Sequence, residues 1–164
     1  MTVISSIKDP ATLTLTLVAE FDATPGDVWD VWEDPRKLER WWGPPTYPAT
    51  FTRHEFVVGG ESRYFMTGPA GETPRGWWRI DAIDKPRRLE FANGLAGADG
   101  EPAPGIEPMS GYVSFEDAAN GTRMTAVTHF VSVEQMETML GMGMQEGMTQ
   151  AIGQIDALLA LAPV

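Results

Sequence analysis

Hydrophobic residues recur at every second position between residues 13 and 21, namely Leu13, Leu15, Leu17, Ala19 and Phe21. A period of two is typical of a strand with one buried face. Further strand-like segments, separated by turns rich in glycine and proline, are predicted over residues 51–58, 62–67, 76–83, 88–93, 110–115 and 122–131. The chain is therefore dominated by about six or seven consecutive strands, which favours an antiparallel sheet.

Two short helices are predicted directly after the first of these strands. Thr24-Pro25 and Asp34-Pro35 each place a capping side chain before a proline at the first helical position. Four of the six tryptophans follow within this segment, between residues 29 and 42. So much aromatic surface on two small helices must cover other parts of the molecule.

The period becomes helical from Ser132 onward, with apolar residues at Met136, Leu140, Met144, Met148, Ile152, Ile155 and Leu159. This spacing predicts one long C-terminal helix of almost thirty residues. Three glycines at positions 141, 143 and 147 interrupt it, and each costs about 1 kcal/mol relative to alanine inside a helix. They indicate a close approach by another element, a bend, or simply close packing. The predicted fold class is α+β, with a curved antiparallel sheet around this helix.

Composition narrows the range of functions. The 164 residues fit a single domain, and the net charge of −11, with 12 basic and 23 acidic residues, disfavours nucleic acid and anionic membranes as partners. The absence of cysteine removes disulfides, thiol nucleophiles and thiolate metal sites. With neither a signal-peptide pattern nor a run of ~20 apolar residues, we expect a cytoplasmic protein without a membrane span.

The order of several short motifs resembles a known family. These motifs include Trp41-Trp42-Gly43-Pro44, Val58-Gly59-Gly60, Met66-Thr67-Gly68-Pro69 and Gly121-Thr122. They resemble the START-like or helix-grip (SRPBCC) superfamily of lipid-transfer, pollen-allergen and polyketide-cyclase domains. Within it, the chain is most similar to the branch named for the C-terminal domain of the activator of a heat-shock-protein ATPase. The resemblance covers residues 12–161, with residues 1–11 as an N-terminal extension, and implies a deep apolar cavity between sheet and helix.

Two positions depart from the family pattern. Relatives often carry an arginine just before the double glycine, where this chain has Val57-Val58, and a tryptophan in the last helix, where it has Gly147-Met148. Both departures predict a more apolar interior and argue against an anionic ligand.

Few residues could perform chemistry in such an interior. If the strands around Gly59-Gly60 place Ser62, Tyr64 and Met66 inward, His54 and Tyr64 lie near each other and could orient a ligand or act as acid and base. Alternatively, His54 is hydrogen-bonded to structure. A strict two-residue turn would instead pair His54 with Phe65 and turn Tyr64 outward.

The predicted ligand-binding residues are aromatic, thioether or imidazole side chains expected on the inner surface: Trp41, Trp42, His54, Tyr64, Met66, Trp78, Phe91, Met124, Met139 and Met142. Adjacent Trp77 and Trp78 cannot both face inward; Trp78 is the predicted inner one, and the other could form a homodimer contact. His54 and His129 are the only histidines and show no metal-ligand spacing. No metal or cofactor is expected.

Three functions remain open at this stage. The favoured one is binding of a small apolar or aromatic molecule in the cavity. The first alternative is a cyclase or hydrolase type of enzyme that uses His54 and Tyr64. The second is a co-chaperone-like protein-interaction module, for which the resemblance is the only support.

Overall fold

The computed structural model describes residues 3–160 and shows eight strands in one antiparallel sheet, ordered β1-β2-β8-β7-β6-β5-β4-β3. The elements in chain order are β1 (Val3–Asp9), β2 (Thr14–Phe21), α1 (Pro25–Glu33), α2 (Pro35–Leu38), β3 (Ala49–His54), β4 (Glu61–Met66), β5 (Arg75–Asp84), β6 (Arg88–Ala96), β7 (Met109–Ala118), β8 (Gly121–His129), α3 (Val133–Gly141), α4 (Met144–Ile152) and α5 (Ile155–Ala160). The predicted α+β helix-grip architecture is confirmed, with one or two more strands than expected.

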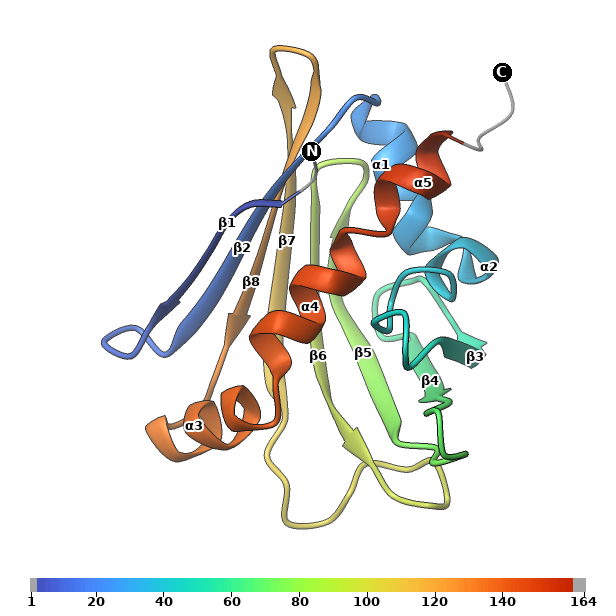
Figure 1. Ribbon diagram of the computed structural model, residues 1–164, viewed down its shortest axis with the longest axis vertical. Coiled ribbons are helices and arrows are strands. Elements are labelled where there is room, and N and C mark those ends of the chain that lie inside the picture. The colour runs from blue at the N-terminus through green and yellow to red at the C-terminus, as the bar shows by residue number, and fades with distance from the viewer. Residues whose placement is uncertain (1–2, 161–164) are drawn as a thin grey trace.

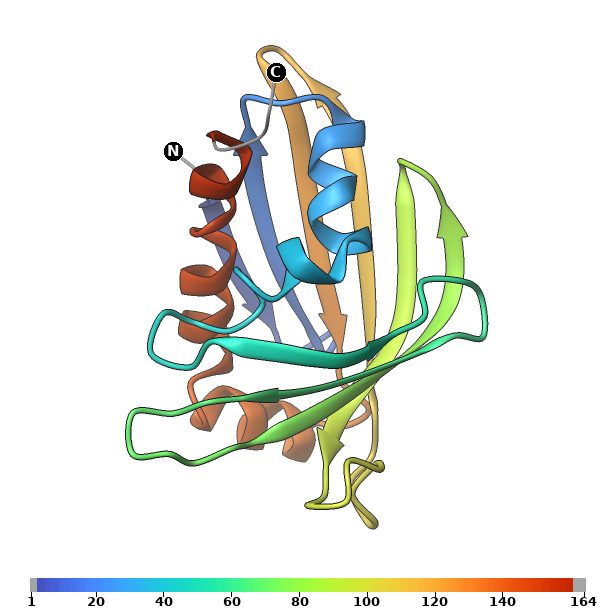
Figure 2. The same cartoon turned by 90° about the vertical axis from the view of Figure 1, so that its right-hand side faces the viewer.

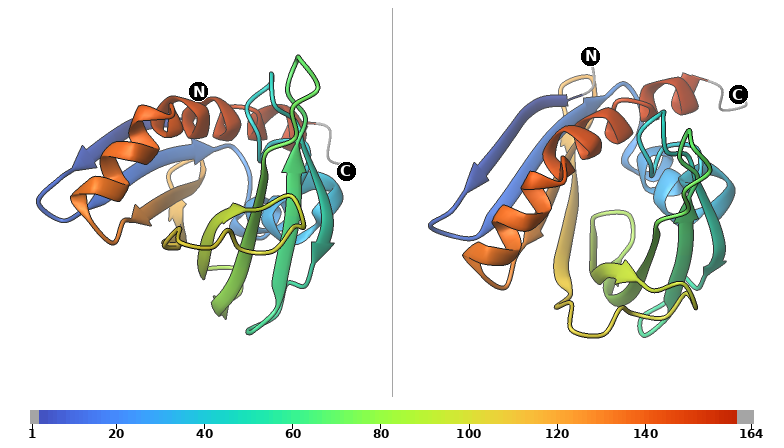
Figure 3. Two further views of the ribbon diagram at one scale, coloured as in Figure 1. Left: turned by 90° about the horizontal axis from the view of Figure 1, so that it is seen from below. Right: turned by 60° about the horizontal axis from the view of Figure 1, so that its bottom comes forward.

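The sheet curves around the helices, which all lie on its concave side. Figure 1 shows α4 running obliquely across the sheet, with α1 and α2 beside the upper part. Figure 2 shows α1 and α2 between the C-terminal helices and strands β5 and β6. Seen from below in Figure 3, the segment from α3 to α5 spans the open side of the curve. The helices and the concave face of the sheet therefore face each other.

The additional strand is β1, which lies within the segment expected as an N-terminal extension. It forms the sheet edge by pairing with β2, for example Ser6 with Leu17. The Gln145 amide of α4 donates hydrogen bonds to the Ser6 carbonyl at 3.3 Å and to its hydroxyl at 2.8 Å. The sequence of β1 lacks regular alternation because an edge strand buries little, and its pattern therefore gave no strand signal.

The two tryptophan-bearing helices begin as predicted. The Thr24 hydroxyl accepts a hydrogen bond from the Asp27 amide at 3.2 Å, and the Asp34 carboxylate accepts one from the Arg36 amide at 2.9 Å. Helix α1 buries Trp29 and Trp32 almost completely. Their rings pack against Phe115 and Phe91 of the sheet.

The predicted long C-terminal helix is interrupted, and in this respect the prediction of one continuous helix was wrong. Helix α3 ends before Met142, and Gly143 adopts a left-handed conformation with φ of 86° before α4 begins. A second interruption at Gly153 separates α4 from α5. Glycine takes the left-handed conformation without steric cost, so Gly143 is where the chain changes direction. None of the helices within residues 3–160 is long and apolar enough to cross a membrane.

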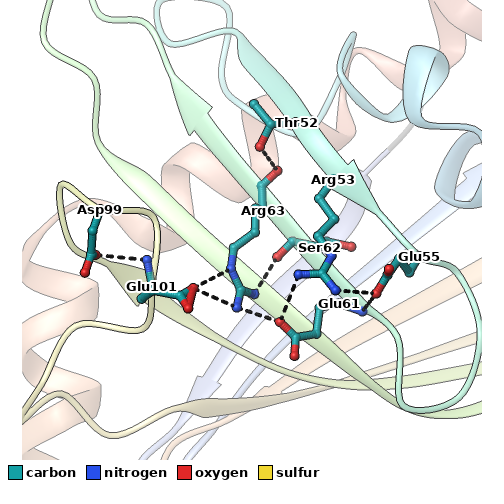
Figure 4. A network of polar contacts seen from close by, with 8 residues as sticks. All are labelled: Thr52, Arg53, Glu55, Glu61, Ser62, Arg63, Asp99 and Glu101. Atoms are coloured by element: carbon teal, nitrogen blue, oxygen red, sulfur yellow. Dashed lines mark hydrogen bonds and ion pairs between the residues drawn. The ribbon is translucent and has the colours of Figure 1, made fainter.

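The segment that follows β6 is held against the outer face of the sheet. The Gly97 amide donates to the Glu101 carbonyl at 2.8 Å, and the Ala103 amide donates to the Leu95 carbonyl at 3.0 Å. The Arg63 guanidinium of β4 pairs with the Glu101 carboxylate at 3.2 Å, within the polar network of Figure 4. The glycine- and proline-rich stretch after β6 is therefore tied to β4 and β6.

Adjacent Trp77 and Trp78 face opposite sides of the sheet, as expected for neighbours in a strand. Trp78 is the inner one and is fully buried. Trp77 lies on the outer face opposite Gly94, but only 8% of it is exposed within the single chain. The outer placement of Trp77 is therefore confirmed, while a homodimer contact through it stays a prediction for which the single chain exposes little of this side chain.

Candidate functional site

A cavity of about 320 Å³ lies between helix α4, the concave face of the sheet and the segment after α2. Its walls combine aromatic, aliphatic and thioether side chains with backbone from the sheet. It is lined by Trp32, Trp41, Trp42, Pro44, Tyr64, Met66, Phe91, Asn93, Leu95, Met109, Gly111, Tyr112, Val113, Ala126, Val127, Thr128, Met139, Met142, Gly143, Met144, Gly147, Met148, Ala151 and Ile152. None of these residues is charged.

Methionine is the commonest residue of the wall. Six methionines line the cavity, one from β4, one from β7 and four from the region of α3 and α4. Methionine side chains are unbranched and polarizable, so they adapt to ligands of different shape. The part of the wall contributed by the C-terminal helices is therefore the most adaptable one.

Two glycines of the sheet allow aromatic rings to lie flat against the inner wall. A side chain at Gly76 would overlap the Tyr64 ring, and a Cβ at Gly111 would approach the Phe91 ring to 2.8 Å. Tyr64 pairs with Gly76 across β4 and β5, and Phe91 pairs with Gly111 across β6 and β7. Each glycine thus creates the place that a cavity-lining ring occupies.

The glycines of the C-terminal helices have a different role. Within residues 3–160, a Cβ at Gly143 or Gly147 would meet no atom within 4 Å beyond its own neighbours in the chain and in the helix. Both residues line the cavity, so they leave its space unfilled. The close approach that was one explanation for these glycines is absent, while the bend occurs at Gly143.

Seven of the ten predicted ligand-binding residues line the cavity: Trp41, Trp42, Tyr64, Met66, Phe91, Met139 and Met142. The other three lie elsewhere in the interior. Trp78 is fully buried behind the wall, stacked on Phe91 with ring centroids 4.5 Å apart. Met124 is fully buried, and its sulfur accepts a hydrogen bond from the Trp32 indole at 3.4 Å. A role of any of these residues in ligand binding remains a prediction.

His54 connects the β3–β4 hairpin to helix α1 and does not line the cavity. Its Nε2 lies 3.0 Å from the Trp32 carbonyl oxygen, and its Nδ1 lies 2.7 Å from the Ser62 hydroxyl. Because a carbonyl only accepts, Nε2 carries the hydrogen in the neutral ring, and Nδ1 accepts from Ser62. Both ring nitrogens are therefore used in holding the structure, which was the alternative to a chemical role.

The register of the hairpin does not pair His54 with Tyr64. Tyr64 faces inward, as the first of the two registers predicted, but His54 pairs with Ser62 and Phe51 pairs with Tyr64. A bulge between Phe51 and Arg53 produces this register. The Phe51 ring contacts both groups, at 5.6 Å from the His54 ring and 4.9 Å from the Tyr64 ring. The register that pairs His54 with Phe65 is wrong.

Burial of His54 predicts a measurable dependence of stability on pH. Desolvation lowers the pKa of His54 below its usual value of 6.5, against the raising effect of the Trp32 carbonyl. Below about pH 6.5 the unfolded chain therefore binds a proton that the folded protein does not bind. The contribution of His54 to the free energy of unfolding is fully present above this pH and is lost as the pH falls below it. We expect a loss of up to about 1.4 kcal/mol per pH unit below this value, measured by urea unfolding between about pH 7.5 and about pH 5.5.

The variant His54→Gln removes this titration and should flatten the pH dependence, whatever its own stability. His129→Gln, at an exposed position at the end of β8, is the matched control and should retain the wild-type slope. Equal slopes in wild type and His54→Gln would show that the buried imidazole does not control acid stability.

Polar groups are sparse in the cavity wall. The lining residues that carry a polar side-chain group are Trp32, Trp41, Trp42, Tyr64, Asn93, Tyr112 and Thr128, and the indoles of Trp32 and Trp41 already donate to the Met124 sulfur and the Val31 carbonyl. Burial raises the pKa of Tyr64, and the neighbouring Trp42 indole opposes this rise. Asn93 and Thr128 were not predicted, although each is a polar residue at an inward position of an alternating strand, which was the available signal.

Residues suited to bind a metal do not gather at this site. Within residues 3–160, no three His, Asp or Glu side chains form a group that could hold a metal ion. The chemistry available to the cavity is therefore hydrogen bonding from a few neutral groups and contact with a large apolar surface.

Comparisons with known proteins agree with this architecture. The solution NMR structure of a protein from Arthrobacter aurescens is 52% identical, with 98% of this chain and 94% of that chain covered and a TM-score of 0.93. The crystal structure of a protein from Mycobacterium smegmatis is 41% identical, with 99% of both chains covered and a TM-score of 0.90. A search of curated proteins found no match.

More distant structures share the fold. The crystal structure of an AHSA1 protein from Silicibacter pomeroyi is 21% identical, with 90% of this chain and 98% of that chain covered and a TM-score of 0.73. The family model described as "Activator of Hsp90 ATPase homolog 1-like protein" matches residues 22–160. The chain therefore belongs to the Activator of Hsp90 ATPase homolog 1-like family, the branch of the helix-grip superfamily that its sequence motifs resembled.

Proposed function

We propose that this protein binds a small hydrophobic or aromatic molecule in the cavity beneath helix α4. The observation that carries the proposal is an uncharged cavity of about 320 Å³ whose wall is apolar apart from a few hydrogen-bonding groups. Ligand pockets have this composition, because apolar area supplies affinity and a few polar groups supply orientation. A volume near the lower end of the usual range of about 300–1,000 Å³ favours a compact molecule over a long lipid.

The unfilled space beside the C-terminal helices supports the same proposal. Protein interiors are normally packed as densely as organic crystals. Helix α4 carries glycine at the cavity-lining position 147, which gives up packing and about 1 kcal/mol of helix propensity. Occupation of that space by a ligand would recover the lost contacts.

The alternatives have less support in the structure. An acid–base pair of His54 and Tyr64 is disfavoured, because both nitrogens of His54 are hydrogen-bonded and its ring does not line the cavity. A co-chaperone role rests on the description of the family alone. Stimulation of a purified Hsp90 ATPase by the protein would favour that role over ligand binding.

The variant Gly147→Leu tests the proposal by filling the cavity from within. A side chain at this position enters open space in the cavity wall and gains helix propensity of up to about 1 kcal/mol. We expect a melting temperature equal to or above that of wild type, and a loss of the thermal shift produced by hydrophobic ligands. A ligand at one hundred times its Kd stabilises the wild type by about 2.7 kcal/mol.

The matched control is Gly141→Leu, at the last position of α3. This residue also has open space around an added Cβ, but it is exposed and does not line the cavity. Ligand-induced shifts should persist in this variant. Unchanged shifts in Gly147→Leu, or no shift of the wild type with any member of a broad panel of apolar and aromatic compounds, would contradict the proposal.

A further inference from the structure

The Tyr64 hydroxyl is a polar group placed in an apolar wall. The Tyr64 ring packs over Gly76 and stacks on Phe51, with centroids 4.9 Å apart and an interplanar angle of 29°. These contacts fix the ring where it lines the cavity. The indole of Trp42 lies beside the hydroxyl, and within the part of the chain that the structure describes no other side chain acts on it.

The neighbouring indole determines which hydrogen-bonding role is left for this hydroxyl. The Trp42 ring meets the Tyr64 ring edge-on, with centroids 6.0 Å apart and an interplanar angle of 83°. Its Nε1 is buried and completes no hydrogen bond within residues 3–160. An indole N–H can only donate, so it offers the Tyr64 hydroxyl no acceptor. The hydrogen of Tyr64 is then free to point into the cavity.

The Tyr64 side chain also remains a donor over the physiological pH range. Burial raises the pKa of Tyr64 above its usual value of 10.0, so the phenol stays protonated. A protonated phenol whose neighbour, the Trp42 indole, cannot accept its hydrogen offers that hydrogen to a ligand.

The cavity wall also selects between charged and uncharged ligands. None of the residues that line the cavity within residues 3–160 is charged. A carboxylate or ammonium group that left water for this site would find no opposite charge, and desolvation of an unpaired ion is costly. The lining therefore disfavours anionic and cationic ligands alike.

We propose that the cavity selects an uncharged apolar molecule that carries a carbonyl oxygen, and that this oxygen accepts a hydrogen bond from the Tyr64 hydroxyl. The inference rests on the proposed function and adds to it the polarity of the ligand. Tyr64 is thereby the residue that distinguishes a ketone or ester from a hydrocarbon of the same shape.

Three naphthalene derivatives substituted at the same ring carbon test this inference: an acetonaphthone, the isopropylnaphthalene and the naphthoate. They share the ring system and approximate shape, but carry a neutral acceptor, no polar group and a negative charge, respectively. Dissociation constants for wild type and Tyr64→Phe can be measured by calorimetric titration. We expect Tyr64→Phe to weaken acetonaphthone about tenfold, as loss of one neutral hydrogen bond does, and to leave isopropylnaphthalene unchanged or bound more tightly.

The naphthoate should bind wild type at least about tenfold more weakly than the acetonaphthone, because its charge finds no partner. Tyr47→Phe, a tyrosine outside the cavity lining, is the matched control and should change neither affinity. If Tyr64→Phe affects ketone and hydrocarbon equally, or if the naphthoate binds best, the inference is wrong while ligand binding itself stands. Failure of all three compounds to bind would overturn both the inference and the proposed function for aromatic ligands of this size.

Discussion

Replacing Trp41 with alanine is expected to lower the free energy of unfolding by about 3–5 kcal/mol, the largest effect of any substitution considered for this protein. Only 1% of Trp41 is exposed, and its indole donates a hydrogen bond to the Val31 carbonyl at 2.9 Å. Its ring packs edge-on against Trp32 and Trp42, with centroids 4.7 Å and 5.6 Å away. Truncation removes all these contacts and leaves a void that extends the cavity.

Urea unfolding at neutral pH measures this loss directly. Trp41→Phe keeps most of the aromatic surface but cannot donate to Val31, so we expect it to lose less than the alanine variant. A loss below about 1.5 kcal/mol for Trp41→Ala would mean that its neighbours collapse into the vacated space, contrary to the rigid aromatic cluster described above.

The second large effect is expected at Gly43, in the Trp-Gly-Pro segment. A methyl group there would overlap the carbonyl oxygen of Tyr47. The obstacle is backbone, which is held by the hydrogen bond from the Tyr47 amide to the Pro44 carbonyl at 2.8 Å. The Gly43 carbonyl also accepts a hydrogen bond from the Gln154 amide at 2.7 Å. Gly43→Ala should therefore cost about 3 kcal/mol, as overpacking against a fixed neighbour does.

Gly141→Ala is the natural comparison, because it adds the same methyl group in open space at the end of a helix. This variant should be as stable as wild type or more stable, by up to about 1 kcal/mol. If the free energy of unfolding of Gly43→Ala also lies within about 0.5 kcal/mol of the wild-type value, the turn between Trp42 and Tyr47 must be able to open without loss of stability.

Local signals in the sequence were sufficient to predict most of the fold. The caps at Thr24 and Asp34 and the alternation from Leu13 to Phe21 each depend on neighbouring residues alone. The tryptophan segment also identified the aromatic end of the cavity, since Trp41 and Trp42 line it. These features were predictable because a side chain and the backbone within a few residues determine them.

Other features depend on contacts that no local pattern reports. Strand β1 is recognisable only through its pairing with β2 and its contact with Gln145. The bulge at Phe51 changes the register by one residue, which alternation by itself cannot predict. At Gly143 the helical spacing of apolar residues continues through the break between α3 and α4. This spacing reports which residues are buried and not whether the backbone is continuous, so it could not predict the break.

The position of strand β2 in the sheet determines which fragments of this protein can fold. The family match begins at residue 22, immediately after β2 ends. A fragment trimmed to the matched residues would lose two strands, and with them Leu15 and Leu17 from the core. It would also leave β8 as an edge strand, because the backbone hydrogen bonds that β8 now makes with Thr14 to Phe21 of β2 would be lost. The residues that the family model matches are thus fewer than those that build the sheet, and expression of the shorter piece would yield an aggregation-prone sheet.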